Sequence, residues 1–252
     1  RKTDKLVFNS KWSLNRFLEG LNKLEIDSNK LVVLYQSANK VKINLKNKKK
    51  IISFVGKLNV AKGYDLFGSA IIKILNKYDT WKGVVIGDEP REKHFFKHKS
   101  LKVLGFKSHK FVLNNFKNSS ISVVCSRWDE PFGRTSLEAS SRGCALIISN
   151  RGGLPETTNH AIILKKLTIK ELYTKIELLI KNHKYRKLLQ KKNYYGFKYT
   201  HKFITKLQDN IRFNVLGIRA FNINKIDKNS KFKILHITNF NERYDGRLHY
   251  NT

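Results

Sequence analysis

Two carboxylates eight positions apart, Glu130 and Glu138, are residues whose type and spacing could do chemistry. A carboxylate accepts two hydrogen bonds at once, so each suits the adjacent hydroxyls of a sugar or a ribose. Gly133 lies between them, just before a predicted helix, where it lets the backbone approach a ligand closely. The free N–H groups at a helix N-terminus favour an anion, typically phosphate. A single Glu is more often a solvated charge. The pair around Gly133 instead predicts a site for a sugar and an anion.

Two lysines, Lys57 and Lys62, follow an apolar strand predicted over Ile51–Val55. They flank a turn that opens at Gly56 and leads into an amphipathic helix predicted over Tyr64–Tyr78. A strand that feeds a glycine turn and a helix opens a nucleotide-binding half-domain. The spacing is not that of a P-loop. Composition alone would make both lysines solvated surface residues, but their place after the strand indicates a grip on a diphosphate.

The elements that must position these groups are strands and helices in alternation. The central stretch predicts a strand (Ile121–Cys125), a helix (Arg134–Arg142), a second strand (Ala145–Ser149) and a glycine-rich turn, because turn formers bound each apolar run. Ligands of an α/β sheet lie beyond the carboxyl ends of its parallel strands, where the polar residues fall here. Further strands are predicted over 83–87, 101–104 and 161–164, and helices over 111–118, 169–181, 185–197 and 203–213.

The motifs E-P-F-G…L-E-A…G and G-G-L-P-E together resemble the E-x7-E signature of retaining glycosyltransferases of family 4, the "glycosyl transferases group 1" type with the GT-B fold. The resemblance runs from about Leu6 to about Phe213. It implies two Rossmann-like halves with a cleft between them, of which this chain is mainly the C-terminal, donor-binding half. The expected fold class is therefore α/β, a Rossmann-like parallel sheet with flanking helices, plus partial flanking segments.

The resemblance also implies roles for the site residues. Glu130, Lys57 and Lys62 would be catalytic: Glu130 would hold the donor sugar, and the lysines would neutralise the departing diphosphate. The family has Arg at the first cation, whereas Lys57 lacks the bidentate fork of a guanidinium. The ribose diol would bind Glu138. The full set expected to contact substrate is Glu138, Phe132, Gly133, Arg134, Thr135, Gly56, Gly105, Phe106 and Gly153.

Phe106 is expected beside the nucleotide base, and a core position for it is about as well supported. No metal is required if lysines carry the charge, and no D-x-D motif occurs. We expect no cofactor beyond the nucleotide diphosphate sugar that serves as donor. Three histidines, His94, His98 and His109, fall in polar segments without ligand-like spacing and are interpreted as solvated loop residues.

Four regions are predicted along the chain. Residues 1–48 would end an N-terminal GT-B domain and form the hinge, with a helix over 12–21 that Ser13 could cap. Residues 49–185 would form the nucleotide-sugar-binding domain, and 186–215 the bracing helices. Residues 216–252 would form a linker and, with a strand at 232–238, the start of a second GT-B module. The chain begins at Arg1 and contains no Met, so we expect a fragment that is inactive alone.

The amino-acid composition limits the classes of molecule that the protein is expected to bind. A net charge of +32 attracts polyanions such as nucleic acid, nucleotide phosphates or an anionic membrane. No zinc-finger, basic-zipper or aromatic RNA-binding pattern accompanies that charge, so no specific nucleic-acid partner is expected. No apolar run reaches the roughly 18 residues of a membrane span and no leader opens the chain. Cys125 and Cys144 are predicted core residues in a reducing compartment. The expected location is cytoplasmic, with peripheral contact at the inner membrane face.

The sequence thus predicts transfer of a hexose-type sugar, with retention, from a nucleotide diphosphate donor to an acceptor hydroxyl. The acceptor would be a sugar or a lipid-linked sugar in envelope polysaccharide or glycolipid synthesis. Uridine and guanosine donors are not distinguished. Two alternatives remain open at this point. One is a non-catalytic module that binds polyanions through charge alone. The other is a different GT-B enzyme, such as a nucleotide-sugar epimerase.

Overall fold

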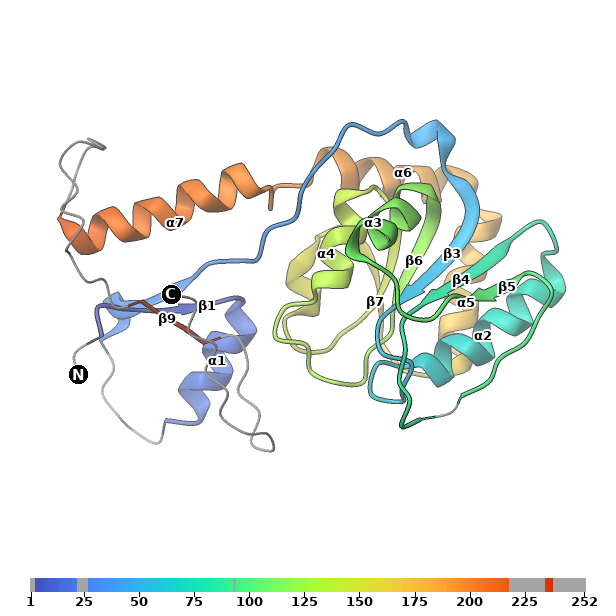
Figure 1. Cartoon of the computed structure of the whole chain (residues 1–252), viewed down its shortest axis with the longest axis horizontal. Helices are drawn as coiled ribbons and strands as arrows, with labels where there is room; N and C mark the ends of the chain where they lie inside the picture. Colours follow the sequence, from blue (N-terminus) through green and yellow to red (C-terminus); the bar gives the residue numbers. More distant parts are fainter. Residues whose placement is uncertain (1–2, 22–26, 93, 218–233, 238–252) are drawn as a thin grey trace.

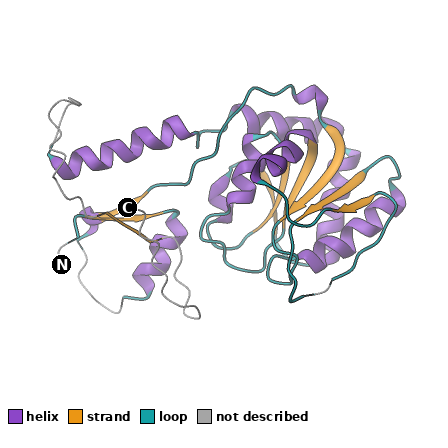
Figure 2. Cartoon of the chain, viewed as in Figure 1, coloured by secondary structure: helices purple, strands orange, loops and turns teal. Residues whose placement is uncertain are grey.

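Six parallel strands form the larger sheet of the protein, in the order β5-β4-β3-β6-β7-β8. The computed structural model describes residues 3–21, 27–92, 94–217 and 234–237. Figures 1 and 2 show the sheet with helices on both faces, so the expected Rossmann-like fold class is confirmed. The strands are β3 (Lys49–Val55), β4 (Lys82–Ile86), β5 (Leu101–Val103), β6 (Ser119–Val124), β7 (Ala145–Ser149) and β8 (Ala161–Leu164).

Both faces of this sheet are buried, which explains why its strands read as continuous apolar runs. Alternate residues of β7 enter different cores: Ile147 packs under one face, while Leu146 and Ile148 pack under the other. The first core includes residues of α2 (Tyr64–Lys77) and α5 (Ile169–Lys181). The second includes residues of α3 (His109–Asn118) and α4 (Arg134–Ser141).

The strand order reverses direction at one point in the sheet. From β3 the chain builds outward through β4 and β5, then returns to place β6 on the other side of β3. Ligands of open α/β sheets bind in the crevice outside the carboxyl ends of strands at such a switch point. The loops after β3 and β6 are therefore the two that the topology brings to the binding edge. They carry the predicted lysines and Glu130.

A smaller parallel sheet has the order β2-β1-β9, with β1 at Lys5–Phe8, β2 at Leu31–Val33 and β9 at Ile234–Ile237. Helix α7 (His201–Leu216) lies along it in Figure 1, and Ile204 is buried in a core shared with Val7 of β1. The strand predicted over 232–238 is present in its described part as β9, paired with β1. The remaining predicted tail from 218 on lies outside the described residues.

Helix α1 (Lys11–Glu19) starts earlier than the sequence predicts. We expected Ser13 to cap it, but the N-cap is Ser10, whose hydroxyl accepts the N–H of Ser13 at 2.9 Å. The two serines are three residues apart, so both satisfy the preference for a hydroxyl at a helix start. The buried position of Ser10 at the end of β1 decides between them.

Two segments connect the small sheet with the large one, and they meet in a parallel bridge between Ala38 and Thr200. Beyond this bridge the linker is fastened to the larger unit. Arg142 donates to the carbonyl of Asn39, and the hydroxyl of Tyr194 donates to the carbonyl of Val41 at 3.0 Å. From Asn39 on, the linker is therefore attached to the large-sheet unit.

Helix α6 (His183–Tyr195) packs against β7 and α4. The predicted domain boundary between 185 and 186 falls inside this helix, so the structure assigns the first bracing helix to the large sheet. Short 3-10 turns complete the elements: η1 (Ser28–Lys30), η2 (Leu45–Asn47) and η3 (Leu154–Thr157). Over the ranges that the structure describes, no helix has the length and apolar character to cross a membrane.

Candidate active site

Lys62 and Glu130 meet at the switch point of the large sheet. Lys62 Nζ lies 2.6 Å from Glu130 Oε1, although the two residues are 68 positions apart. The Lys62 side chain is 31% exposed and that of Glu130 is 15% exposed, so neither group is fully buried. The contact joins the loop after β3 to the loop after β6. The structure therefore brings one predicted cation and one predicted carboxylate together.

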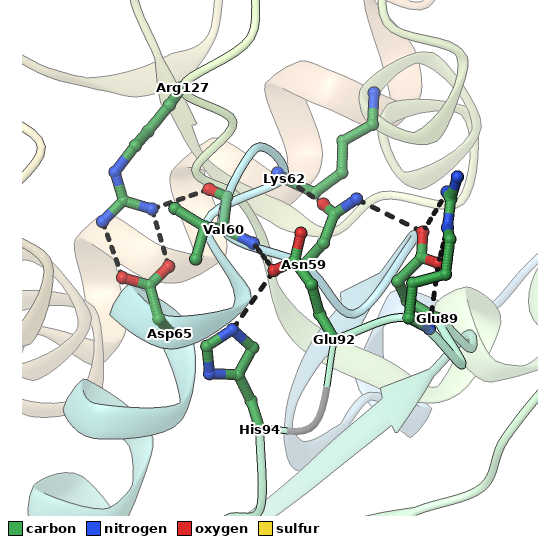
Figure 3. A network of polar contacts seen from close by, with 9 residues as sticks. Asn59, Val60, Lys62, Asp65, Glu89, Glu92, His94 and Arg127 are labelled. Carbon is green, nitrogen blue, oxygen red and sulfur yellow. Dashed lines mark hydrogen bonds and ion pairs between the residues drawn. The ribbon is translucent and has the colours of Figure 1, made fainter.

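The loop that carries Lys62 is held by a network of polar contacts, shown in Figure 3. Asn59 Oδ1 accepts the N–H of Lys62 at 2.9 Å, and the carboxylate of Glu92 accepts the N–H of Val60 at 2.9 Å. Arg127 donates to the carbonyl of Val60 at 2.7 Å. In Figure 3 the Lys62 side chain extends away from this network. The network holds the loop through its backbone, so the Lys62 ammonium takes no part in it and is paired with Glu130.

Arg127 also forms a two-pronged ion pair with Asp65, at 2.6 and 2.7 Å. Partial burial opposes ionisation of Asp65, but the hydrogen bonds and the positive charge of Arg127 outweigh it and lower the pKa of the carboxyl. Asp65 lies in the first turn of α2, and Arg127 in the loop after β6. The pair therefore fixes the two site loops to each other, next to the Lys62–Glu130 contact.

Lys57 lies near a different carboxylate, that of Glu89. Its positive charge acts on Glu89, a carboxylate that Arg91 binds at 2.7 and 2.9 Å. Those bonds are the main reason why the pKa of Glu89 falls to about 2. Within the described part of the chain, Lys62 and not Lys57 is bonded to Glu130. The second predicted cation is therefore exposed at the same edge of the sheet, on its Glu89 side.

Glu138 is buried in α4 and its Oε1 accepts two bonds, from Arg134 Nε at 2.8 Å and His109 Nε2 at 2.9 Å. His109 is largely exposed, as the sequence predicts, but it does not lie in a loop: it begins α3, and its Nε2 reaches Glu138 across 29 residues. No local pattern signals this contact. His94 and His98 are likewise hydrogen-bonded, to Glu92 and to the N–H of Ser100.

The N-terminus of α4 lies between the two glutamates along the chain. Its N-cap, Gly133, has a φ of 109° and no side chain caps the helix. This φ favours glycine, and a Cβ at Gly133 would also lie 2.4 Å from the side-chain atom Leu154 Cδ1. The first amides of the helix, at Arg134 and Thr135, have no earlier helical carbonyl to bond. They can therefore receive an anion.

Two predicted contact residues are placed very differently. Phe132 is buried between Tyr35 and Tyr199, with ring centroids 5.5 and 6.0 Å away. Only its main chain is left for the expected substrate contact, because its ring belongs to the core that joins the two sheets. Phe106 is 82% exposed and follows the Gly105 turn. Of the two interpretations offered by the sequence for Phe106, the core position is excluded, and a contact with the base stays a prediction.

Glycine turns pack closely against one another beside the Lys62–Glu130 contact. A Cβ at Gly87 would lie 1.8 Å from the carbonyl oxygen of Gly56, and the N–H of Gly87 donates to the carbonyl of Gly105 at 3.0 Å. These contacts stack the turns that follow β3, β4 and β5. On the other side, the N–H of Gly153 donates to the carbonyl of Glu130 at 2.7 Å. Gly153 therefore supports the main chain of Glu130.

The described residues include no group of three or more His, Cys, Asp or Glu side chains placed to hold a metal ion. Both cysteines are buried and unpaired, as the sequence predicts. Burial raises the pKa of the Cys125 thiol to about 12, so the thiol stays protonated and unreactive. Cys125 therefore serves in the packing of the core.

A family model described as "Glycosyl transferases group 1" matches residues 35–196. The chain belongs to this family. The matched segment contains Lys62, Glu130, Glu138 and α4, so the site described above lies inside it. The resemblance that the motifs predicted is confirmed at this level, and the narrower assignment to the retaining family 4 stays a prediction.

Two curated relatives come from Bacillus subtilis (strain 168). Spore coat protein SA is 32% identical over 123 residues, which cover 43% of this chain and 32% of that protein. The putative glycosyltransferase YtcC is 29% identical over 127 residues, 45% of this chain and 31% of that protein. The matched part is thus about a third of the length of these relatives.

Solved structures share the fold at low sequence identity. A glycosyltransferase from Rickettsia africae ESF-5 has a TM-score of 0.69 at 19% identity, covering 84% of this chain and 64% of that chain. Anabaena Alr3699/HepE in complex with UDP-glucose has a TM-score of 0.70 at 14% identity, covering 86% of this chain and 65% of that chain. These likenesses establish the fold of glycosyltransferases.

Proposed function

We propose that the protein is a glycosyltransferase that moves a sugar from a nucleotide diphosphate donor to an acceptor hydroxyl. The observation that carries the proposal is the Lys62–Glu130 contact of 2.6 Å at the switch point, with the uncapped N-terminus of α4 a few residues further along the same loop. An ammonium and free amides suit a diphosphate, and a carboxylate suits sugar hydroxyls. Family membership and the UDP-glucose complex of HepE, which shares the fold, support the same ligand.

The chemistry follows from where charge develops. The bond between the anomeric carbon and the diphosphate oxygen breaks, the acceptor oxygen bonds to that carbon, and the acceptor proton passes to the departing diphosphate. While this happens, negative charge grows on the diphosphate and positive charge on the sugar. Lys62 and the first amides of α4 face the negative end. Glu130 holds the sugar and stabilises its positive charge. Glu138 binds the ribose diol through Oε2, because Arg134 and His109 already occupy Oε1 and fix the carboxylate.

The finer assignments belong to the same proposal. The transferred sugar is a hexose, its anomeric configuration is retained, and no metal takes part. The acceptor is a sugar or lipid-linked sugar in envelope polysaccharide or glycolipid synthesis. The net charge of +32 supports contact with an anionic inner membrane face from the cytoplasm.

Calorimetry with UDP, GDP and their hexose conjugates tests the donor site. Lys62→Met should weaken diphosphate binding about 10- to 100-fold, the effect of removing a charged hydrogen-bond donor. Lys73→Met, on an exposed position of α2, changes the net charge equally and should leave binding intact. Equal losses in both variants would instead support the polyanion-binding alternative, in which only total charge matters.

Product analysis with a labelled nucleotide sugar separates transfer from epimerisation. A transferase moves label to an added acceptor, whereas an epimerase changes the nucleotide sugar without one. Because the chain spans about a third of its curated relatives, the donor-binding experiment tests the site directly even where transfer requires further residues.

A further inference from the structure

The N-terminus of α1, in the small-sheet unit, contacts the loop that carries Glu130. Ser10 Oγ donates to the carbonyl of Pro131 at 2.5 Å, and Ser13 Oγ reaches the same oxygen at 3.1 Å. These bonds span 121 and 118 residues of sequence, so they connect the two units of the fold. Ser10 is fully buried, so its hydroxyl has lost water as a partner and donates its one proton to Pro131 or to Ser13 Oγ, 2.9 Å away.

Glu156, at the end of the G-G-L-P-E turn, contacts the same helix end. Its carboxylate accepts the N–H of Lys11 at 2.8 Å and the N–H of Trp12 at 2.9 Å. A carboxylate at a helix N-terminus binds free amides and complements the positive end of the helix dipole. Burial, together with the nearby Glu156, raises the pKa of Tyr35, so this phenol stays protonated beside the carboxylate. The loop that carries Glu130 and the turn that carries Glu156 therefore both contact the N-terminus of α1.

These contacts converge on the main chain of Glu130. Its own carbonyl accepts the N–H of Gly153 at 2.7 Å, and the following carbonyl, that of Pro131, accepts Ser10. The atoms around Gly153 are tightly packed, because a Cβ there would lie 2.5 Å from the Pro131 oxygen and 2.8 Å from Ser10 Oγ. The Glu130 peptide is thus fixed from the large sheet on one side and from α1 on the other.

We propose that Ser10, Ser13 and Glu156 form an α1 latch that orients Glu130 only when the small sheet is docked against the large one. These are positioning residues: they act on the carboxylate through the Pro131 carbonyl and the Gly153 turn. The latch bonds are polar and can exchange with water when the two units separate, a movement that also opens the apolar core shared by Val7 and Phe132. The position of the Glu130 carboxylate then depends on whether the two units are docked. The assignment of Glu130 to a donor sugar rests on the proposed function; the coupling of α1 to the loops does not.

Amide hydrogen exchange followed by mass spectrometry tests the coupling without any substrate. Ser10→Gly removes the hydroxyl with little loss of helix capping, because Gly is tolerated at an N-cap. It should speed exchange at the Gly153 amide roughly fivefold to tenfold, more than 140 positions along the chain, as expected for one lost hydrogen bond. Glu156→Gln should speed exchange at Lys11 and Trp12.

Glu171→Gln is the matched control. Glu171 also accepts two backbone N–H groups, from Lys165 and Lys166, but entirely within the large-sheet unit. It should leave exchange at the latch amides and at Gly153 unchanged. If Ser10→Gly changes exchange only within α1 and leaves Gly153 as in the wild type, the latch is structural and the proposal is overturned.

Calorimetry then connects the latch to the site. Ser10→Gly should weaken binding of a nucleotide diphosphate hexose severalfold and leave the nucleoside diphosphate alone unaffected, because Glu130 contacts the sugar. Equal weakening of both ligands contradicts positioning of Glu130. If the wild type binds neither ligand, the proposed function fails, while the exchange result still decides whether α1 is coupled to the loop.

Discussion

Gly152→Ala should displace Glu130 without touching its side chain. Gly152 has a φ of 57°, and a Cβ there would lie 2.1 Å from the carbonyl oxygen of Glu130 and 2.6 Å from its nitrogen. Ordinary contact needs about 3.4 Å, so the Glu130 peptide must move by roughly 1 Å. Left-handed backbone strain costs about 1–2 kcal/mol and the overlap about 1–3 kcal/mol, so the free energy of unfolding should fall by about 2–5 kcal/mol.

A loss of this size leaves a typical domain folded, so binding can be measured in the same variant. A shift of about 1 Å at a positioned group can reduce its effect 100-fold. Calorimetry should therefore show the affinity for a nucleotide diphosphate hexose falling at least tenfold, with a smaller change for the nucleoside diphosphate. Urea unfolding measures the stability loss.

Gly217→Ala is the control for backbone strain alone. Gly217 ends α7 with a φ of 66°, and nothing lies within 4 Å of the Cβ position. It should lose only about 1–2 kcal/mol and bind donor normally. The reasoning is refuted if Gly152→Ala loses no more stability than Gly217→Ala and still prefers the nucleotide sugar over the nucleoside diphosphate.

Three further predictions concern the surroundings of the site. Arg127→Met should lower the free energy of unfolding by about 1 kcal/mol, and by less in 1 M salt, because its pair with Asp65 is partly exposed; urea unfolding at two salt concentrations measures this. Arg91 lowers the pKa of Glu89 from 4.5 to about 2, so Glu89 stabilises the fold above about pH 4.5 and loses this effect as pH falls toward 2. The stability difference between wild type and Glu89→Gln should therefore shrink over that range in urea unfolding. Because burial raises the thiol pKa values of Cys125 and Cys144, neither should react with Ellman's reagent at pH 8 until urea unfolds the chain.

The large sheet was predictable because its strands are buried on both faces. Segments such as Ala145–Ser149 and Ala161–Leu164 are short apolar runs between turn formers, and both form strands over the predicted residues. Local sequence suffices there, since a strand needs the same residue types whichever neighbour it pairs with. Lys62 and Glu130 could be assigned to one edge because both follow such strands.

Contacts between distant segments were not predictable in the same way. His109 reads as a polar loop residue until α3 places it against Glu138. Ser10 and Ser13 are equivalent as caps in the sequence, and burial at the end of β1 separates them. Lys57 shares the residue type and the loop of Lys62, yet its charge acts on Glu89. Each difference depends on packing across the fold, which no local pattern records.

The attachment of the linker to the large-sheet unit determines where a shortened form of this protein should begin. Lys48 donates to the carbonyl of Phe116 at 2.7 Å, and Arg142 and Tyr194 bind the linker at Asn39 and Val41. A shorter polypeptide that starts at β3 would strip these partners away and expose the surface they cover. One that begins near residue 39 and runs through α6 keeps these linker contacts, but it loses Tyr35 and Tyr199 and so exposes the ring of Phe132. A piece for crystallising the large-sheet unit therefore needs Phe132 replaced by a polar residue.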